Sequence, residues 1–323
     1  MSPLLKDAVR IFTPIGNLGY GYSTEIFWKT LDTYDVDAII CDAGSTDSGP
    51  QKLALGHTTV PKESYETDLE PMVAAAHSRR IPIIITSVGG DGSSAHVDLI
   101  VDLIDGIVTS RQYRTLKVLK LYAEIPKATV TEALHARPSR IAPCGGGVPD
   151  LTDENIKSAS RIVAQMGIEP FLAAMDEHPD FDIIIAGRTY DPAPYAAFCL
   201  HRGISDLGIG YHMGKILECG AQCAVPKSRE VLATVRQDSF EITPLDPAAR
   251  CTALSVAAHT LYEKSRPYYH YGPDGMLDLT QATYVELSDG RSVRVQGSKF
   301  QRSTVESKWT VKLEGARRNG YHR

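Results

Sequence analysis

Short apolar runs alternate with helix-length stretches through the first two thirds of the chain. The runs are rich in β-branched residues, as is typical of strands buried on both faces of a parallel sheet; they occupy residues 36–41, 81–88, 118–122 and 182–186. Residues 67–78 and 152–165 have helical composition, and the second stretch opens with a Thr-Asp-Glu start signal. This alternation predicts an α/β fold with a doubly wound, mostly parallel sheet.

The pattern changes near residue 225. Residues 231–240 and 283–295 alternate between apolar and polar positions, and Ser288-Asp289-Gly290 forms a hairpin-turn signal inside the second segment. We therefore expect two domains. Residues 1–224 form the α/β domain with its glycine-rich strand-end loops, and residues 225–323 form a smaller β-rich α+β region.

Composition narrows the class of protein. The 323-residue chain is 43% hydrophobic, and it contains no run of about 18 apolar residues, so no membrane span is expected. The first ten residues lack the apolar segment of a secretion signal, which favours the cytoplasm. Six scattered cysteines are expected to be reduced thiols. A formal net charge of -5 without a basic tract argues against nucleic acid, so small molecules are the expected partners.

The loop after the first of these runs combines glycines with carboxylates and hydroxyls. Ligands of a doubly wound sheet bind where parallel strands end, so this loop is a candidate for substrate binding. The alternative is a capped strand-to-helix turn, because the same residue types are favoured caps. The candidate residues are Asp42, Gly44, Ser45, Thr46 and Asp47.

The loop after the second run carries the clearest acid–base candidate. Gly89 and Gly90 precede His96 in a loop that resembles a cradle for phosphate or carboxylate. An imidazole titrates near neutral pH, and either Asp91 or Asp98 would orient it. The alternative is a histidine that only caps or packs the following helix.

A third loop places Cys144 and Gly145 before two further glycines and a predicted helix. Cys144 becomes a candidate nucleophile if backbone dipoles lower its pKa. The alternative is a small structural cysteine. None of these loops matches the phosphate-binding or dinucleotide-binding glycine motifs, so there is no nicotinamide or flavin signature.

The fourth run ends before Arg188 and Asp191. An arginine at a strand end suits a bidentate grip on a carboxylate or phosphate, and Asp191 would hold it or accept a proton. Farther along, His212, Lys215 and Glu218 recur at helical spacing and would share one helix face. The alternative for this segment is a solvated helix face that stops at a glycine.

Several blocks in order along the chain resemble the acyclic terpene utilisation AtuA-like family. They cover most of the chain, which makes the resemblance more specific than any single glycine loop. The matching blocks are Thr13-Pro14-Ile15-Gly16, residues 42–47, residues 89–98, residues 166–171, Ala186-Gly187-Arg188, residues 216–221, residues 255–259 and residues 311–315.

The resemblance also implies something about assembly. Members of the family usually continue beyond the Leu-Glu-Gly block into another α/β portion, whereas this sequence stops at Arg323. Some members are described beside a small partner protein. We therefore expect a homo-oligomer or a complex with a small partner subunit.

These observations favour a lyase of the hydratase or dehydratase type, acting on a small carboxylate or an acyl-thioester of terpenoid or branched-acid origin. His96, Asp91, Asp98, Arg188 and Glu218 are the catalytic candidates. A divalent metal, Mg²⁺ or Zn²⁺, would take its ligands from Asp42, Asp47, Asp91 and His96.

Two alternatives stay open. One is a hydrolase that uses Cys144 or a metal-bound water as its nucleophile. The other is a non-catalytic subunit of a complex that processes acyl-thioesters.

Overall fold

A computed structural model describes residues 7–44, 48–145, 147–261, 266–273, 275–303 and 310–318. Its centre is a nine-stranded mixed sheet with the order β11-β12-β8-β7-β1-β2-β3-β6-β4. Five neighbouring strands are parallel: β1 (Val9–Thr13), β2 (Ala38–Asp42), β3 (Ile83–Thr86), β6 (Ile183–Ala186) and β4 (Val118–Leu121). The last four coincide with the predicted apolar runs, which confirms them.

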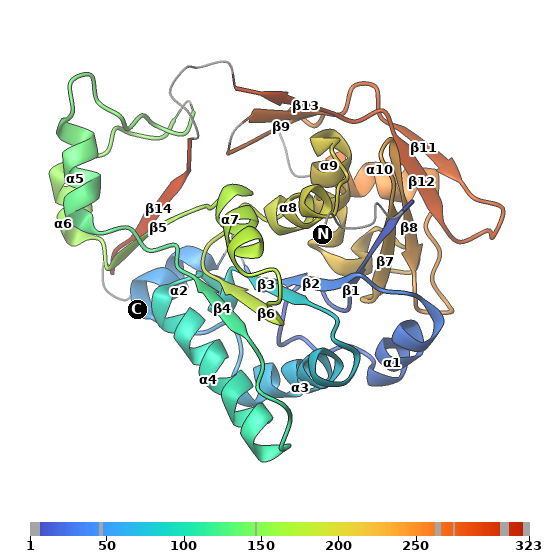
Figure 1. The fold of residues 1–323 in the computed structure, drawn as a ribbon. Coiled ribbons are helices and arrows are strands. Elements are labelled where there is room, and N and C mark those ends of the chain that lie inside the picture. Colours follow the sequence, from blue (N-terminus) through green and yellow to red (C-terminus); the bar gives the residue numbers. More distant parts are fainter. Residues whose placement is uncertain are drawn as a thin grey trace, which may run out of the picture.

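Helices cover both faces of the parallel strands (Figure 1). Successive isoleucines of β3 point to opposite faces: Ile84 packs with one core cluster, whereas Ile83 and Ile85 pack with the other. The second cluster includes residues of α1 (Thr24–Thr33), α3 (Lys62–Arg79) and α4 (Ser94–Ser110), and the first includes α7 (Glu169–Glu177), α8 (Ala193–His201) and α9 (Leu207–Leu217). The doubly wound α/β prediction is thus confirmed, as is the helix predicted at 67–78, which lies within α3.

The C-terminal third continues the same sheet with antiparallel strands. β7 (Val231–Val235) pairs with β1, and β8 (Ser239–Pro244), β12 (Val293–Gln296) and β11 (Thr283–Glu286) follow in that order. The predicted hairpin turn lies between β11 and β12, as expected. A separate three-stranded sheet is formed by β9 (Tyr269–Gly272), β10 (Gly275–Asp278) and β13 (Lys299–Arg302), and α10 (Ala253–Leu261) precedes it. The C-terminal region is therefore β-rich, and the boundary at residue 225 stays a prediction.

The helix predicted over 152–165 is wrong in its second half. The Thr152 capping box starts α6 (Asp153–Ser158), but Ala159 leaves the helical conformation, with φ -57° and ψ 136°, and ends the helix. β5 (Arg161–Ala164) follows and pairs antiparallel with β14 (Leu313–Ala316), about 150 residues farther along the chain. Pairing with so distant a segment overrides the local helical composition.

Four short elements remain. They are α2 (Gly49–Leu55), α5 (Lys127–His135), and the 3-10 turns η1 (Val88–Gly90) and η2 (Gly220–Cys223). Figure 1 shows α2 beside the β5–β14 pair. In the ranges that the structure describes, no helix has both the length and the apolar character needed to cross a membrane.

Candidate active site

The candidate site lies where β2, β3 and β6 end at their carboxyl edge. Asp42 is the last residue of β2, Ser87 follows β3, and Arg188 follows β6. These strands are neighbours in the sheet, so their ends meet. A Cβ on Gly44 would lie 2.8 Å from the Ser87 Cβ and 3.2 Å from an Arg188 nitrogen. The three loops are therefore in direct contact.

The loop after β3, residues 87–93, presses against the backbone that follows β6. The amide of Arg188 donates to the Gly92 carbonyl at 3.1 Å. Gly92 has φ +64°, and a Cβ there would lie 2.0 Å from the backbone nitrogen of Arg188. Only glycine accommodates both the left-handed conformation and this close approach. We call residues 87–93 the β3 loop.

Asp91 and His96 form a buried pair at the start of α4. The His96 Nδ1 lies 2.6 Å from Asp91 Oδ1, which also accepts the Ser93 amide at 2.9 Å. A Cβ on Gly89 would lie 2.3 Å from the imidazole, so the glycine makes room for this ring. Although burial opposes it, the hydrogen bond and charge of His96 lower the pKa of Asp91. With Nδ1 held by a carboxylate, Nε2 is the nitrogen left for proton transfer.

Asp98, the other carboxylate proposed to orient His96, lies elsewhere. Its Oδ1 accepts hydrogen bonds from Lys120 Nζ at 2.8 Å and from the Tyr122 hydroxyl at 2.6 Å, and about half of its side chain is exposed. Residues two apart on a helix point in different directions, so Asp98 cannot face the His96 ring from α4. The expectation that Asp98 orients His96 is wrong.

Arg188 is only 2% exposed, and protein groups surround its guanidinium. Its Nε donates to Glu314 at 2.9 Å, and its Nη1 donates to Asp191 at 3.1 Å. Nη1 also lies 3.3 Å from the Ser87 hydroxyl. Burial disfavours the charge, but Asp191 and Glu314 outweigh it and raise the pKa of Arg188. The arginine predicted to grip a ligand is thus engaged by the protein's own carboxylates.

Asp42 is a buried carboxyl at the same edge. Its oxygens accept hydrogen bonds from the Thr86 hydroxyl at 2.8 Å and from the Gly44 amide at 2.9 Å. Burial, followed by the negative charge of Asp191, raises the pKa of Asp42 to about 7, against the opposing influence of Arg188. This carboxyl can therefore hold or release a proton near neutral pH.

A second buried carboxyl, Glu218, follows α9 and joins the same cluster. Lys215 forms an ion pair with it, and it shares a hydrogen bond with Asp191. Burial and then the charge of Asp191 raise the pKa of Glu218, against the opposing influence of Lys215. Asp191 thus interacts electrostatically with both Asp42 and Glu218, and Arg188 interacts with Asp42 and Asp191.

His212 does not join Lys215 and Glu218. Its Nδ1 lies 2.6 Å from the Ser298 hydroxyl, and its ring packs edge-on against Phe240. Burial lowers the pKa of His212 to about 3. Every residue of α9 after the half-buried Leu207 is buried, so the alternative of a solvated helix face is also wrong.

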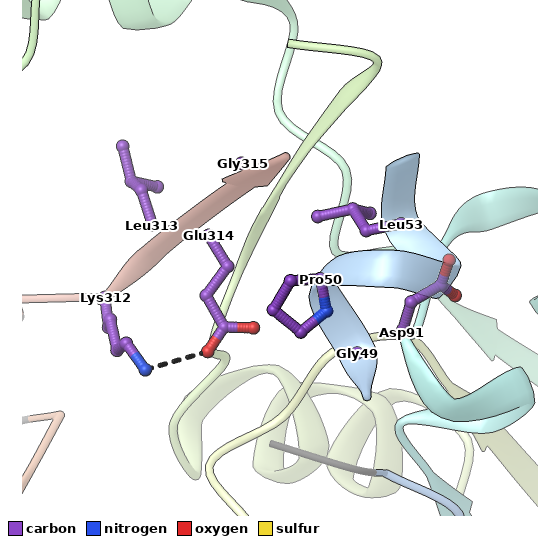
Figure 2. Close-up of a pocket in the computed structure, with 8 residues that line it drawn as sticks. All are labelled: Gly49, Pro50, Leu53, Asp91, Lys312, Leu313, Glu314 and Gly315. Atoms are coloured by element: carbon purple, nitrogen blue, oxygen red, sulfur yellow. Dashed lines mark ion pairs between the residues drawn. The ribbon is translucent and has the colours of Figure 1, made fainter. Parts of the chain in front are cut away.

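A pocket of about 230 Å³ lies between α2, Asp91 and β14. In Figure 2 the Glu314 carboxylate points toward Pro50 of α2, and Lys312 pairs with Glu314 at 3.0 Å. Glu314 thus connects the pocket wall to Arg188. In the sequence, Glu314 lies in the Leu-Glu-Gly block that resembles the AtuA-like family, but no local pattern predicts a role for it. Its place in that block is the signal that could have identified it as a site residue.

Other predicted residues are not gathered at this pocket. Cys144 and Gly145 are exposed in a loop that follows α5 rather than a strand, and Gly145 donates its amide to the Pro143 carbonyl at 2.9 Å. The Gly90 amide likewise donates within its own loop, to Ser87 at 3.2 Å. Neither N–H is directed at a ligand. Ser45, Thr46 and Asp47 lie outside the described residues.

The described candidates for metal ligands, Asp42, Asp91 and His96, do not form a metal site. Across the described ranges, no three His, Cys, Asp or Glu side chains converge in an arrangement that could hold a metal ion. Asp42 already accepts two hydrogen bonds, and Asp91 is paired with His96. Asp47, the remaining candidate, lies outside the described residues, so a metal site that includes it stays a prediction.

Comparison with known proteins gives one match. No curated protein and no solved structure matches the chain. The family model described as "Acyclic terpene utilisation family protein AtuA" matches residues 15–322. This range spans nearly the whole sequence and includes every residue of the candidate site. The chain therefore belongs to the acyclic terpene utilisation AtuA family.

Proposed function

We propose that this protein is a lyase of the hydratase or dehydratase type that acts on a small carboxylate or on the acyl end of a thioester. The observation that supports this most strongly is the buried Asp91–His96 pair, with 2.6 Å between Oδ1 and Nδ1. Such a pair orients an imidazole as a general base near neutral pH. The family's description favours a substrate derived from an acyclic terpene.

In the dehydration direction, His96 Nε2 takes a proton from the carbon beside the substrate carbonyl. The electrons of that C–H bond form the new C=C bond, and the hydroxyl on the next carbon receives a proton and leaves as water. Asp42 supplies this proton, since its pKa of about 7 keeps part of the population protonated at neutral pH. His96 then loses its proton to solvent and Asp42 takes one up, which restores the starting state.

Arg188 acts in this scheme as a positioning residue. Its buried charge offsets those of Asp191 and Glu314, and it limits the rise of the Asp42 pKa. Removing the guanidinium would leave the buried Asp42 and the half-buried Asp191 without this counter-charge, which is costly. Arg188 thus moderates the pKa of Asp42, which burial and Asp191 raise, without itself contacting the substrate.

Substitution of the pair tests the proposal. With a panel of hydroxy and unsaturated carboxylates and their thioesters, we expect His96→Gln and Asp91→Asn to lower turnover by about 10²- to 10⁴-fold, the usual contribution of a positioned base. Asp98→Asn is the matched control, because this nearby carboxylate is paired with Lys120 and not with His96. Wild-type turnover in a folded His96→Gln variant would exclude His96 as the base.

A further inference from the structure

Two buried cysteines from separate segments of the chain are in contact. The Sγ atoms of Cys223 and Cys251 lie 3.8 Å apart, and the residues are 1% and 2% exposed. Cys223 ends η2, and Cys251 lies shortly before α10. Both are free thiols. The contact therefore joins two segments that are 28 positions apart in the sequence.

The backbone beside the two thiols holds these segments together. Val225 and Arg250 form an antiparallel bridge in which each amide donates to the other's carbonyl, at 2.8 and 3.1 Å. The Cys251 amide also donates to the Arg291 carbonyl at 2.8 Å. A disulfide needs about 2.0 Å between its sulfur atoms. Because the backbones are already paired, we expect small side-chain rotations to close the remaining gap.

Burial and mutual contact determine how these thiols react. The hydrogen bond with Cys251, followed by burial, raises the pKa of Cys223. Since the thiolate is the reactive form, the pair should react slowly with alkylating reagents. Gln222 and Arg250, their neighbours in sequence, are exposed, so the pair lies close to the surface and a small uncharged oxidant has a short path to it. Once one sulfur is oxidised, its partner is already in place, which strongly accelerates the second step.

We propose that Cys223 and Cys251 are a site of reversible oxidation, at which hydrogen peroxide converts the two thiols into a disulfide. The thiolate of one cysteine attacks a peroxide oxygen, the O–O bond breaks, and a sulfenic acid and one water form. The sulfur of the second cysteine then attacks the sulfenic sulfur, the S–S bond forms, and the hydroxyl leaves with the remaining thiol proton as a second water. The thiol pair loses two electrons, and the peroxide gains them.

The new bond would change the constraints on the C-terminal part of the sheet. It would close a loop that contains β7 and β8, the strands that continue the sheet beyond β1. A cross-link of this kind restricts the unfolded chain more than the folded one, so the oxidised protein should be harder to unfold.

Mass spectrometry of the folded full chain after treatment with hydrogen peroxide tests the proposal. Remaining thiols are alkylated in denaturant, and the chain is digested with trypsin without reduction. We expect a cross-linked peptide that contains Cys251 as the main disulfide, and its loss when dithiothreitol is added. One tryptic peptide carries both Cys219 and Cys223, so Cys219→Ala should retain the cross-link whereas Cys223→Ala should abolish it.

Urea unfolding gives a second readout on the same samples. The midpoint of the peroxide-treated wild-type chain should lie at a higher urea concentration than that of the reduced chain, and dithiothreitol should reverse the shift. Cys144→Ala is the matched control. It removes an exposed thiol outside the pair and should retain both the cross-link and the shift.

The wild-type chain alone decides the outcome if Cys223→Ala does not fold, because fragmentation of the linked peptide identifies the bonded sulfur. The proposal is overturned if treatment that fully oxidises Cys144 yields no Cys223–Cys251 cross-link in the folded chain. It is also overturned if Cys251 links to Cys219 instead, or if the cross-link forms only after unfolding in urea.

Discussion

Two glycine-rich loops of this protein look alike in sequence and differ in structure. The β3 loop is buried, and Cβ atoms on Gly89 and Gly92 would collide with His96 and Arg188. In the loop between α5 and α6, residues 136–152, Cys144 is exposed, and a Cβ on Gly145 would meet nothing within 4 Å. Glycine content alone therefore does not mark a site. A site is marked instead by polar side chains that pack closely around the glycines.

The largest expected effect comes from Gly92→Ala. The new methyl group would meet the Arg188 backbone at 2.0 Å in a left-handed conformation, so the loops after β3 and β6 must separate. We expect a loss of about 3 kcal/mol or more in the free energy of unfolding, measured in urea.

Gly106→Ala is the matched control for Gly92→Ala. Gly106 lies in α4 with open space around it, and alanine should stabilise the helix there by about 0.5–1 kcal/mol. If Gly92→Ala were as stable as wild type, that result would contradict the claim that the β3 loop is closely packed and the α5–α6 loop is not.

An intermediate effect is expected in the pH dependence of stability. Asp42 has an ordinary pKa of 3.8 and a folded-state pKa of about 7. Between these values the folded protein holds a proton that the unfolded chain releases, so the contribution of Asp42 is full below about pH 3.8 and declines up to about pH 7. Asp42→Asn cannot ionise, so the difference in unfolding free energy, wild type minus variant, should fall over this range and level off above it.

Denaturant unfolding at several pH values measures this difference. A difference that is constant between pH 4 and pH 7 would show that Asp42 titrates as an ordinary exposed carboxyl. In that case it could not serve as the acid of the proposed reaction.

The smallest effect is expected at Cys144. Its side chain is exposed in the α5–α6 loop, so Cys144→Ser should change the free energy of unfolding by less than about 0.5 kcal/mol. Alkylation with iodoacetamide should modify Cys144 readily and leave turnover unchanged. If alkylation abolished turnover and bound substrate prevented this loss, the hydrolase with Cys144 as nucleophile would be supported instead. The α5–α6 loop would then be part of a functional site.

Local sequence was sufficient for the features that depend on near neighbours. The short apolar runs predicted four of the five parallel strands, all but β1, and the spacing within one loop made Asp91 one of two candidates to orient His96. The sequence alone does not distinguish Asp91 from Asp98 as the partner of His96. The helical geometry of α4 does, because Asp98 lies only two residues from His96 on the same helix and so points in a different direction.

Long-range pairing set the limits of prediction. The local composition of β5 predicts a helix. The strand that overrides this composition, β14, lies near the other end of the chain, so no local pattern indicates the pairing. Glu314 contacts Arg188 across 126 residues, so no local pattern indicated that Arg188 was already engaged.

The most direct test of the central claim is deuterium exchange at the carbon beside the carbonyl of hydroxy and unsaturated carboxylates and their thioesters, followed by NMR in D₂O. The proposed role of the Asp91–His96 pair predicts that the wild-type chain incorporates deuterium at this carbon in at least one compound, that Asp98→Asn does so at a similar rate, and that His96→Gln does not. Equal exchange by wild type and folded His96→Gln, or no exchange with any compound, would contradict it.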